Sequence, residues 1–347
     1  MRGSVIVRSK DEADRLRLTL ASLIQQTEKA EIIVVNDGSR DHTRAVIEEA
    51  AENFSIISID NAEPLGRSAA ANVGAQRASG DILIFLDGDT LAAPNFVAAH
   101  LATHRSAVRG GQRLVGRGET YHLRCTRFFA DPETGTPQPG HEARVACLKE
   151  AELSRMRVTQ NDITERFATI DERASPGIYP GVGPRLLYEM EMNALRAYPD
   201  CEVLWAAASG ANQSVCREAF LTAGGFDVLL TINEHRELAL RLCRAGLRMV
   251  PVSARTYHLT HRTGWRDPLL DTSWETFFYQ AHPIPAVPLL SVLWSSLADP
   301  VPFPTSCRIV SLPELSAAAR RCGSTLGIEN VREAHFRFCE MATGDAS

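Results

Sequence analysis

Three aspartates stand at the ends of apolar runs, where their carboxylates could bind a metal ion. Asp37 follows the run 31–35, and Asp87 and Asp89 follow the run 82–86. Two like charges one residue apart repel each other unless a positive group lies between them. A hard divalent cation takes oxygen ligands and keeps open positions for phosphate oxygens. A lone Asp-x-Asp is more often only a tight turn, so the surrounding sequence has to decide.

The first 90 residues alternate between short apolar runs and helical patterns. Buried strands are predicted at four places, 5–7, 31–35, 55–59 and 82–86. Apolar side chains recur with helical spacing between them, across 11–26, around 46–50 and across 66–79. This alternation is typical of an α/β fold, in which helices cover a mostly parallel, Rossmann-like sheet. Because parallel strands end on one edge, where such sheets bind ligands, we expect Asp37, Asp87 and Asp89 to share one crevice.

The middle and the end of the chain are less regular. Glycines make 106–120 read as turns or edge strands, and a loop is predicted over 131–142. A charged helical pattern covers 143–200, a length that indicates a functional flap or an acceptor-binding region. A strand is predicted at 247–252, and the helix before it stops at Gly246.

Composition excludes several classes of partner. The chain has 347 residues and a net charge of -5 without a basic tract, so neither nucleic acid nor an anionic membrane is indicated. No apolar stretch reaches the ~20 residues of a membrane helix, and the first residues lack the pattern of a signal peptide. We expect a cytoplasmic protein. The eight cysteines show no zinc or redox spacing, so free thiols are expected.

Several blocks carry a family resemblance when they are taken in order. They are SVIVRSKDEADRLRLTLASLIQQ, EIIVVNDGSRDHT, PLGRSAAANVGAQRASGDILIFLDGDT and SGANQSVCREAFLTAGGFD. Together they resemble family 2 glycosyltransferases of the GT-A fold over roughly residues 3–100 and 205–262.

The resemblance implies a division of the chain. We expect a GT-A domain over 1–268, with a nucleotide-sugar-binding half at 1–105 and an acceptor and catalytic half at 201–268. The region 121–200 would be an insertion that shapes the acceptor pocket. Residues 269–347 would form a partly helical C-terminal extension.

The resemblance also assigns roles to residues of the donor site. Asp37 would bind the base of a uridine nucleotide, and Asp89 would hold Mn²⁺ or Mg²⁺ against the diphosphate. Asp87 would bind the ribose or the donor sugar and could add a ligand to the metal. The remaining donor contacts would come from Val7, Arg8, Ser9, Arg67 and Asn72.

Histidines could complete the metal site. His258 and His261 follow the strand near 247–252, where related enzymes often use a histidine, and His258 is the preferred ligand of the two. His100 and His104 have i, i+4 spacing on a predicted helix, which suits a metal in principle. No third ligand stands near them, so they are expected to be solvated.

The general base departs from the family pattern. Glutamate and aspartate usually stand where this chain has Glu234 and His235, and the aspartate is the usual base of an inverting transfer. His235 could replace it, since a histidine is mostly neutral at pH 7. Alternatively Glu234 or Glu237 is the base, or a thiol or amine acceptor needs none. Glu234 also fits a capping box that begins at Thr231. The substitution puts inversion in doubt.

The sequence gives fewer indications of the residues that would bind the acceptor. Trp205 and Trp265 could stack on a sugar, although core packing is the slightly better interpretation of Trp205. Asp227 is expected to order a turn. The sequence thus predicts metal-dependent transfer from a nucleotide-sugar, most simply a UDP-sugar, to a hydroxyl or amine of a small molecule or peptide, as in secondary metabolism. A homodimer is a further expected state.

Two rival functions differ in class. A sugar nucleotidyltransferase would usually carry a Gly-rich loop after the first strand, where this chain has Arg8-Ser9-Lys10-Asp11. A nucleotide-sugar-binding protein without turnover would explain the unusual Glu-His pair. Donor turnover would exclude it.

Overall fold

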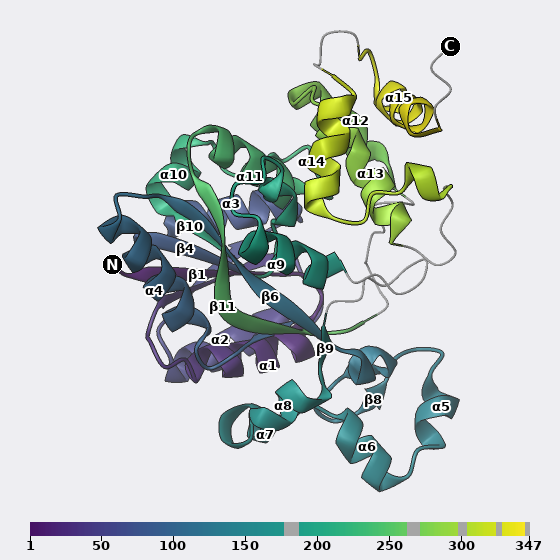
Figure 1. Ribbon diagram of the computed structural model, residues 1–347. Coiled ribbons are helices and arrows are strands. Elements are labelled where there is room, and N and C mark those ends of the chain that lie inside the picture. Colours follow the sequence, from purple (N-terminus) through teal and green to yellow (C-terminus); the bar gives the residue numbers. More distant parts are fainter. Residues whose placement is uncertain (177–186, 262–270, 298–303, 324–327, 344–347) are drawn as a thin grey trace.

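The computed structural model describes residues 1–176, 187–261, 271–297, 304–323 and 328–343 (Figure 1). A nine-stranded sheet lies at its centre, with the order β3-β2-β1-β4-β10-β6-β11-β5 and with β9 paired to β6. The strands are β1 (Gly3–Ser9), β2 (Glu31–Asp37), β3 (Ile56–Asn61), β4 (Ile82–Asp87), β5 (Thr90–Ala92), β6 (Leu114–Leu123), β9 (Ser175–Pro176), β10 (Gln213–Cys216) and β11 (Arg248–Leu259).

Most of these strands run in one direction. β3, β2, β1 and β4 are mutually parallel, and β6 pairs in parallel with β11. β10 is antiparallel to both β4 and β6, so β6 and β11 point the same way as β4. The C-terminal ends of β1, β2, β4, β6 and β11 therefore meet at one edge. This edge is the predicted crevice.

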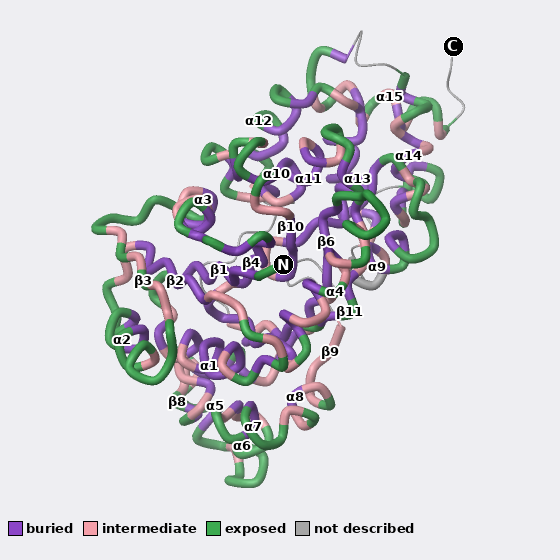
Figure 2. The backbone as a smooth tube through the Cα atoms, turned by 90° about the vertical axis from the view of Figure 1, so that its left-hand side faces the viewer, coloured by how far each residue is buried: buried purple, intermediate pink, exposed green. Residues whose placement is uncertain are grey.

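Helices cover both faces of the parallel part of the sheet. Val5 and Val7 of β1 pack toward α1 (Ala13–Ile24) and α2 (Thr43–Asn53), whereas Ile6 packs toward α3 (Arg67–Arg77). This follows from the alternation of side chains along a strand. Figure 2 shows the buried strands β1, β2 and β4 between α3 on one side and α1 and α2 on the other.

The prediction of turns or edge strands over 106–120 is wrong except for the turn at Gly110 and Gly111. α4 (Phe96–Arg109) fills the first part, and β6 then runs between β10 and β11 inside the sheet. The glycines that suggested turns are instead required for close packing. A Cβ at Gly116 would lie 2.6 Å from Oγ of Ser214, and a Cβ at Gly118 would collide with the amide of Asn212. The glycines therefore make room for buried polar side chains of the neighbouring strand.

His100 and His104 use that room, so the expectation that they are solvated is also wrong. Both are buried, and both approach Oγ of Ser214, through Nδ1 of His100 at 2.8 Å and Nε2 of His104 at 2.9 Å. Nε2 of His100 lies 2.9 Å from Oδ1 of Asn212. Burial lowers the pKa of His100 to about 4 and that of His104 to about 3, so both are neutral at pH 7.

Within the region 121–200, residues 124–173 form a separate lobe, and the chain returns to the sheet at β9 (Figure 1). The predicted loop 131–142 begins at the end of one short strand and contains a second strand that pairs with the first. The elements of the lobe are η1 (Arg124–Phe128), β7 (Phe129–Asp131), β8 (Thr136–Pro137), α5 (Glu142–Ala146), α6 (Glu150–Met156), α7 (Gln160–Glu165) and α8 (Ala168–Arg173). After it come α9 (Leu187–Ala197), η2 (Leu204–Ala207), α10 (Arg217–Thr222) and α11 (Glu234–Arg244).

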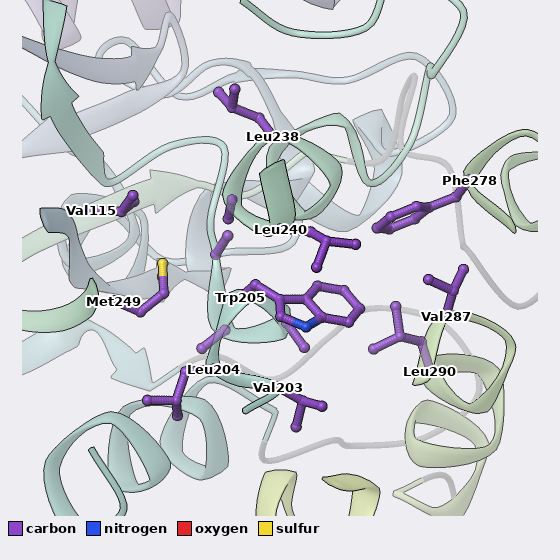
Figure 3. Packing of buried hydrophobic residues seen from close by; sticks show 14 of the residues in the cluster. Val115, Val203, Leu204, Trp205, Leu238, Leu240, Met249, Phe278, Val287 and Leu290 are labelled. Carbon is purple, nitrogen blue, oxygen red and sulfur yellow. The ribbon is translucent and has the colours of Figure 1, made fainter. Parts of the chain in front are cut away.

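The C-terminal extension is helical and shares a core with the rest of the chain. It contains α12 (Ser273–Ala281), α13 (Ala286–Ser296), η3 (Thr305–Cys307), α14 (Leu312–Arg321) and α15 (Val331–Thr343). Trp205 of η2 is 2% exposed and packs edge-on against Phe278 of α12, with ring centroids 5.7 Å apart. Figure 3 shows its indole among Leu240, Val287 and Leu290. A ring so enclosed has no free face for a sugar, which corrects the proposed acceptor role of Trp205.

In the described part of the chain, no helix has both the length and the apolar character that crossing a membrane requires.

Candidate active site

The two carboxylates after β4 have different positive partners. Oδ1 of Asp87 accepts a hydrogen bond from Nε of Arg8 at 2.7 Å, and Oδ2 lies 3.3 Å from Nη2 of Arg67. Asp89 instead faces two imidazoles. Because each carboxylate has its own partners, the repulsion between them is offset without a cation placed between the two.

Asp89, His258 and His261 form a group that fits a metal ion. Nε2 of His258 and Nε2 of His261 lie 3.2 Å and 2.8 Å from the same oxygen, Oδ2 of Asp89. The three ligand atoms lie within 4.8 Å of one another. Burial alone would raise the pKa of Asp89, but the two histidines hold it well below its usual range. A carboxylate and two imidazoles with positions left open suit a divalent transition-metal ion such as Mn²⁺ better than Mg²⁺, which prefers oxygen ligands. Asp87 is not in this group.

Asp37 lies at the end of β2, where its carboxylate orders the turn before α3. Oδ1 accepts from the backbone N–H of Leu65 at 2.8 Å and from Nδ2 of Asn61 at 2.9 Å, and Oδ2 accepts from the N–H of Gly66 at 2.9 Å. The same turn leads directly into Arg67. Asp37 therefore sets the position of the arginine that reaches Asp87.

Four further predicted donor contacts lie on β1 and α3. Arg8 and Ser9 end β1, and both are buried beside β4. The side chain of Val7 is fully buried against α1, so only its backbone could reach a ligand. Asn72 uses its amide on both sides of Phe226, accepting from the N–H at 2.8 Å and donating to the carbonyl at 2.8 Å. Asn72 therefore holds a turn, and the second N–H of its amide is left for the donor contact expected of it.

Glu234 begins α11 and points toward the arginines. The predicted capping box is wrong, because Asn233 precedes the helix in a left-handed conformation with φ 66 and Glu234 is the first helical residue. Oε1 of Glu234 lies 3.3 Å from Nη1 of Arg8. Burial would raise the pKa of Glu234, but His235, Arg8 and Arg67 together lower it far more. The carboxylate is therefore ionised at neutral pH.

His235 is held by its neighbour in the chain. Nη1 of Arg236 lies 2.8 Å from Nε2 of His235, and an arginine can only donate. Nε2 therefore accepts, and the neutral imidazole carries its proton on Nδ1. This Nδ1 is buried without a hydrogen-bond partner, 3.7 Å from Oε2 of Glu234. Burial and the charge of Arg236 lower the pKa of His235.

Arg236 is itself fixed in a buried ionic cluster. Glu191 of α9 accepts from Arg236 at 2.8 Å and from Arg117 of β6 at 2.9 Å. Arg236 also donates to the carbonyl of Ala206 at 2.8 Å, and its guanidinium lies 5.0 Å from the ring centroid of Trp294 in α13. The cluster joins three parts of the chain directly behind His235.

The remaining predicted residues have structural partners. Glu237 accepts from Arg241 through both oxygens and lies 2.8 Å from Nε2 of His282, which corrects its candidacy as a free base. Asp227 orders its turn as expected, by accepting from the N–H of Leu229 at 2.9 Å. Trp265 lies outside the described residues.

One carboxylate of this crevice was missed by sequence reasoning. Glu12 stands just before α1, and a Cβ at Gly88 would lie 2.5 Å from its Oε1. Burial, followed by the charges of Asp89 and Asp87, raises the pKa of Glu12 well above its ordinary value. Its position three residues after the end of β1, on the ligand-binding edge of a parallel sheet, was the available indication.

Comparison with known proteins agrees with this geometry. The family model described as Glycosyl transferase family 2 matches residues 4–147. Over this part of its length the chain is therefore similar to glycosyl transferase family 2. The match runs from β1 through β6, includes the Asp-x-Asp, and ends just after α5 of the lobe.

Curated relatives match only part of their length. The uncharacterized glycosyltransferase YfnE of Bacillus subtilis (strain 168) is 38% identical over 108 residues, which are 30% of this chain and 28% of that protein. A poly-beta-1,6-N-acetyl-D-glucosamine synthase of Staphylococcus aureus (strain MSSA476) is 39% identical over 82 residues, 23% of this chain and 20% of its own. The similarity thus spans less than a third of these relatives.

The fold extends further than the sequence match. A crystal structure of S. aureus TarS 1-349 in complex with UDP superposes with a TM-score of 0.51 at 12% identity, covering 99% of this chain and 92% of that one. At this identity the comparison establishes the architecture. The fold is GT-A, a mostly parallel sheet flanked by helices, as the sequence predicted.

Proposed function

We propose that this chain is a metal-dependent glycosyltransferase that moves a sugar from a nucleotide-sugar to an acceptor. The observation that carries the proposal is the convergence of Asp89, His258 and His261 at the strand edge of a domain similar to glycosyl transferase family 2. The arginines Arg8 and Arg67 stand beside them on Asp87. A metal ion and the two guanidinium groups would both attract the negative charge of the diphosphate in the donor.

The donor we propose is a UDP-sugar. Asp37 would accept a hydrogen bond from the uracil N–H, since each carboxylate oxygen has two acceptor positions and Oδ2 uses only one for Gly66. Asp89, His258 and His261 would hold Mn²⁺ or Mg²⁺, which when bound neutralises the leaving diphosphate. Arg67, with a side chain 56% exposed, is placed to contact the donor from the other side of the crevice.

Glu234 is the group we propose to accept the proton of the acceptor. His235 stands at the position where the family usually has an aspartate, but Arg236 occupies its Nε2. Glu234 is ionised and close to the same point. Its lowered pKa makes it a weak base, which is sufficient because the attacking oxygen becomes strongly acidic as its bond to the anomeric carbon forms. The acceptor we propose is a hydroxyl or amine of a small molecule or peptide.

Thermal unfolding with a nucleotide panel tests the donor. UDP, GDP, dTDP and CDP are each added with and without Mn²⁺. A ligand at 100 times its Kd adds about 2.7 kcal/mol to stability, which corresponds to a shift of a few degrees for a chain of this size. Stabilisation by UDP only together with Mn²⁺ supports the proposal. A stronger effect of another nucleotide would remove the uridine assignment of Asp37.

A nucleotide-sugar-binding protein without turnover is the second candidate. The observation that favours it is the hydrogen bond from Arg236 to His235, which leaves the usual base position without a free lone pair. Release of UDP from a UDP-sugar in the presence of an acceptor pool would exclude this candidate. Donor binding without any release, including slow hydrolysis, would favour it.

A further inference from the structure

The strand end that carries His258 and His261 is tied to the lobe formed by residues 124–173. β11 pairs with β5 and β6, and its pairing with β6 continues to Leu259 at the edge of the sheet that holds the candidate site. There, contacts from outside the sheet reach 255, 257, 259 and 260. The lobe was expected to shape an acceptor pocket, and these contacts point to another role.

Arg15 of α1 forms the central contact. Its side chain is 6% exposed, and its guanidinium donates to three backbone carbonyls, of Leu259 at 3.2 Å, Phe129 at 2.7 Å and Ala130 at 3.0 Å. Phe129 and Ala130 belong to β7 of the lobe. Leu259 follows His258 directly, and its N–H donates to the carbonyl of Asp89 at 2.8 Å. Arg15 thus links β7 to Leu259, which is next to His258 in the chain and is hydrogen-bonded to the backbone of Asp89.

Thr126 of η1 fixes the next residue. Its single O–H is shared between the carbonyl of Thr260 at 3.0 Å and that of Leu123 at 2.9 Å. Thr126 is fully buried, so no water replaces either bond. Because Thr260 directly precedes His261, this hydroxyl holds the backbone from which the His261 side chain extends.

Asp171 of α8 completes the set of contacts from the lobe. Its carboxylate accepts from Nη1 of Arg255 at 2.8 Å and 3.1 Å and from the hydroxyl of Tyr257 at 2.6 Å. Tyr257 is the neighbour of His258 on the other side. Contacts from the lobe thus reach the side chains of Arg255 and Tyr257, before His258, and the carbonyl of Thr260, between His258 and His261.

We propose that Arg15 and Thr126 are positioning residues that set the affinity of the Asp89-His258-His261 group for a divalent cation, with the lobe 124–173 acting as a brace. A metal site needs its ligands held to a fraction of an ångström, and loss of an outer partner typically weakens metal binding 10- to 100-fold. The inference rests on the metal site of the proposed function. It assigns the lobe to the metal, in addition to any acceptor role.

Mn²⁺ binding to the full chain tests the brace without any need for turnover. The free Mn²⁺ signal in electron paramagnetic resonance gives Kd for the wild type and the variants, in the presence of saturating UDP. Thr126→Val removes the hydroxyl without changing the volume, and Thr126→Ser restores it. The matched control is Thr103→Val, which removes a hydroxyl that bonds only the carbonyl of Ala99 within α4. Arg15→Met is the stronger variant.

We expect Thr126→Val to weaken Mn²⁺ binding about 3- to 10-fold and Arg15→Met by 10-fold or more. Thr126→Ser should return to the wild-type Kd, and Thr103→Val should not differ from it. If Arg15→Met does not fold, the threonine variants decide. Unchanged Kd in folded Thr126→Val and Arg15→Met would overturn the brace alone. Absence of Mn²⁺ binding in the wild type would overturn both the brace and the proposed metal dependence.

Discussion

Arg236 donates from Nη1 to Nε2 of the adjacent His235 at 2.8 Å, and this bond decides the tautomer of the imidazole. A guanidinium remains protonated at any pH relevant to a protein, so Nε2 is always the accepting atom while the contact persists. The proton must then be on Nδ1, which faces Glu234. A histidine in this state is a donor. The position of the usual family base therefore presents a buried N–H to Glu234.

Substitution of Glu234 and His235 should separate the two candidate bases. We expect Glu234→Gln to lower kcat 100-fold or more, the usual contribution of a general base, with little change in the Kd of the donor. His235→Asn keeps a donor near the place of Nδ1 and should cost less. Initial rates of donor turnover and calorimetric donor binding provide the two quantities. A larger loss of kcat in His235→Asn would restore His235 as the base, as the sequence favoured.

The two aspartates of the Asp-x-Asp should respond differently to substitution. Asp89→Asn removes the charge that His258 and His261 share, so Mn²⁺ affinity should fall by more than 100-fold. Asp87 pairs with Arg8 and Arg67, so Asp87→Asn should leave the Mn²⁺ Kd within a few-fold of the wild type while it weakens donor binding. Metal titration and donor titration check both effects. Equal loss of Mn²⁺ in the two variants would make Asp87 a metal ligand.

The residues of the donor half could be predicted from the pattern of apolar runs and from the rule that parallel strands end on one edge of a sheet. Apolar runs located β1, β2 and β4, and parallel pairing brought Asp37, Asp87 and Asp89 to one edge. His258 and His261 were found through the family resemblance, and the structure places both on Asp89. No long-range contact was needed for any of these predictions.

The errors concern residues whose partners are distant in sequence. Gly116 and Gly118 have the composition of a turn, and only the side chains of β10 show why they stand in a central strand. Asn72 has the chemistry of a donor contact, yet its amide also holds the N–H and the carbonyl of Phe226. Nothing in the sequence indicated that Arg236 would donate a hydrogen bond to Nε2 of His235. Such contacts become visible only when the sheet is assembled.

The buried histidines of α4 should make stability depend on pH. In the unfolded chain a histidine takes up a proton near pH 6.5, whereas in the folded chain the pKa is about 4 for His100 and about 3 for His104. Below pH 6.5 the unfolded state therefore binds more protons, and stability falls as pH falls. Each histidine contributes about 1 kcal/mol over the first pH unit below 6.5, and the slope then approaches ~1.4 kcal/mol per unit.

Replacement of one of these histidines should reduce that slope. His104→Gln keeps a donor for Ser214 and cannot titrate. Between pH 6.5 and 5.5 the free energy of unfolding should fall by about 1 kcal/mol less in the variant than in the wild type. Urea unfolding at the two pH values gives the comparison. Identical slopes for both proteins would show that His104 is accessible to protons in the folded state.

His282 connects the C-terminal extension to the helix that carries Glu234. Nη1 of Arg244 lies 2.9 Å from its Nδ1 and must donate, so the proton is on Nε2, which donates to Oε1 of Glu237 at 2.8 Å. Glu237 is buried, and both of its oxygens also accept from Arg241. His282→Ala leaves part of a buried carboxylate unpaired and should lower the free energy of unfolding by about 1–3 kcal/mol.

The same variant should affect catalysis through the position of α11. Because His282 contacts the helix but not the crevice, we expect kcat to fall several-fold while the donor Kd, set at the ends of β1, β2 and β4, stays unchanged. His282→Gln restores a donor to Glu237 and should recover part of both losses. Urea unfolding, donor calorimetry and initial rates measure the three quantities. A variant that lost stability but kept the wild-type kcat would show that the extension supports the fold without positioning Glu234.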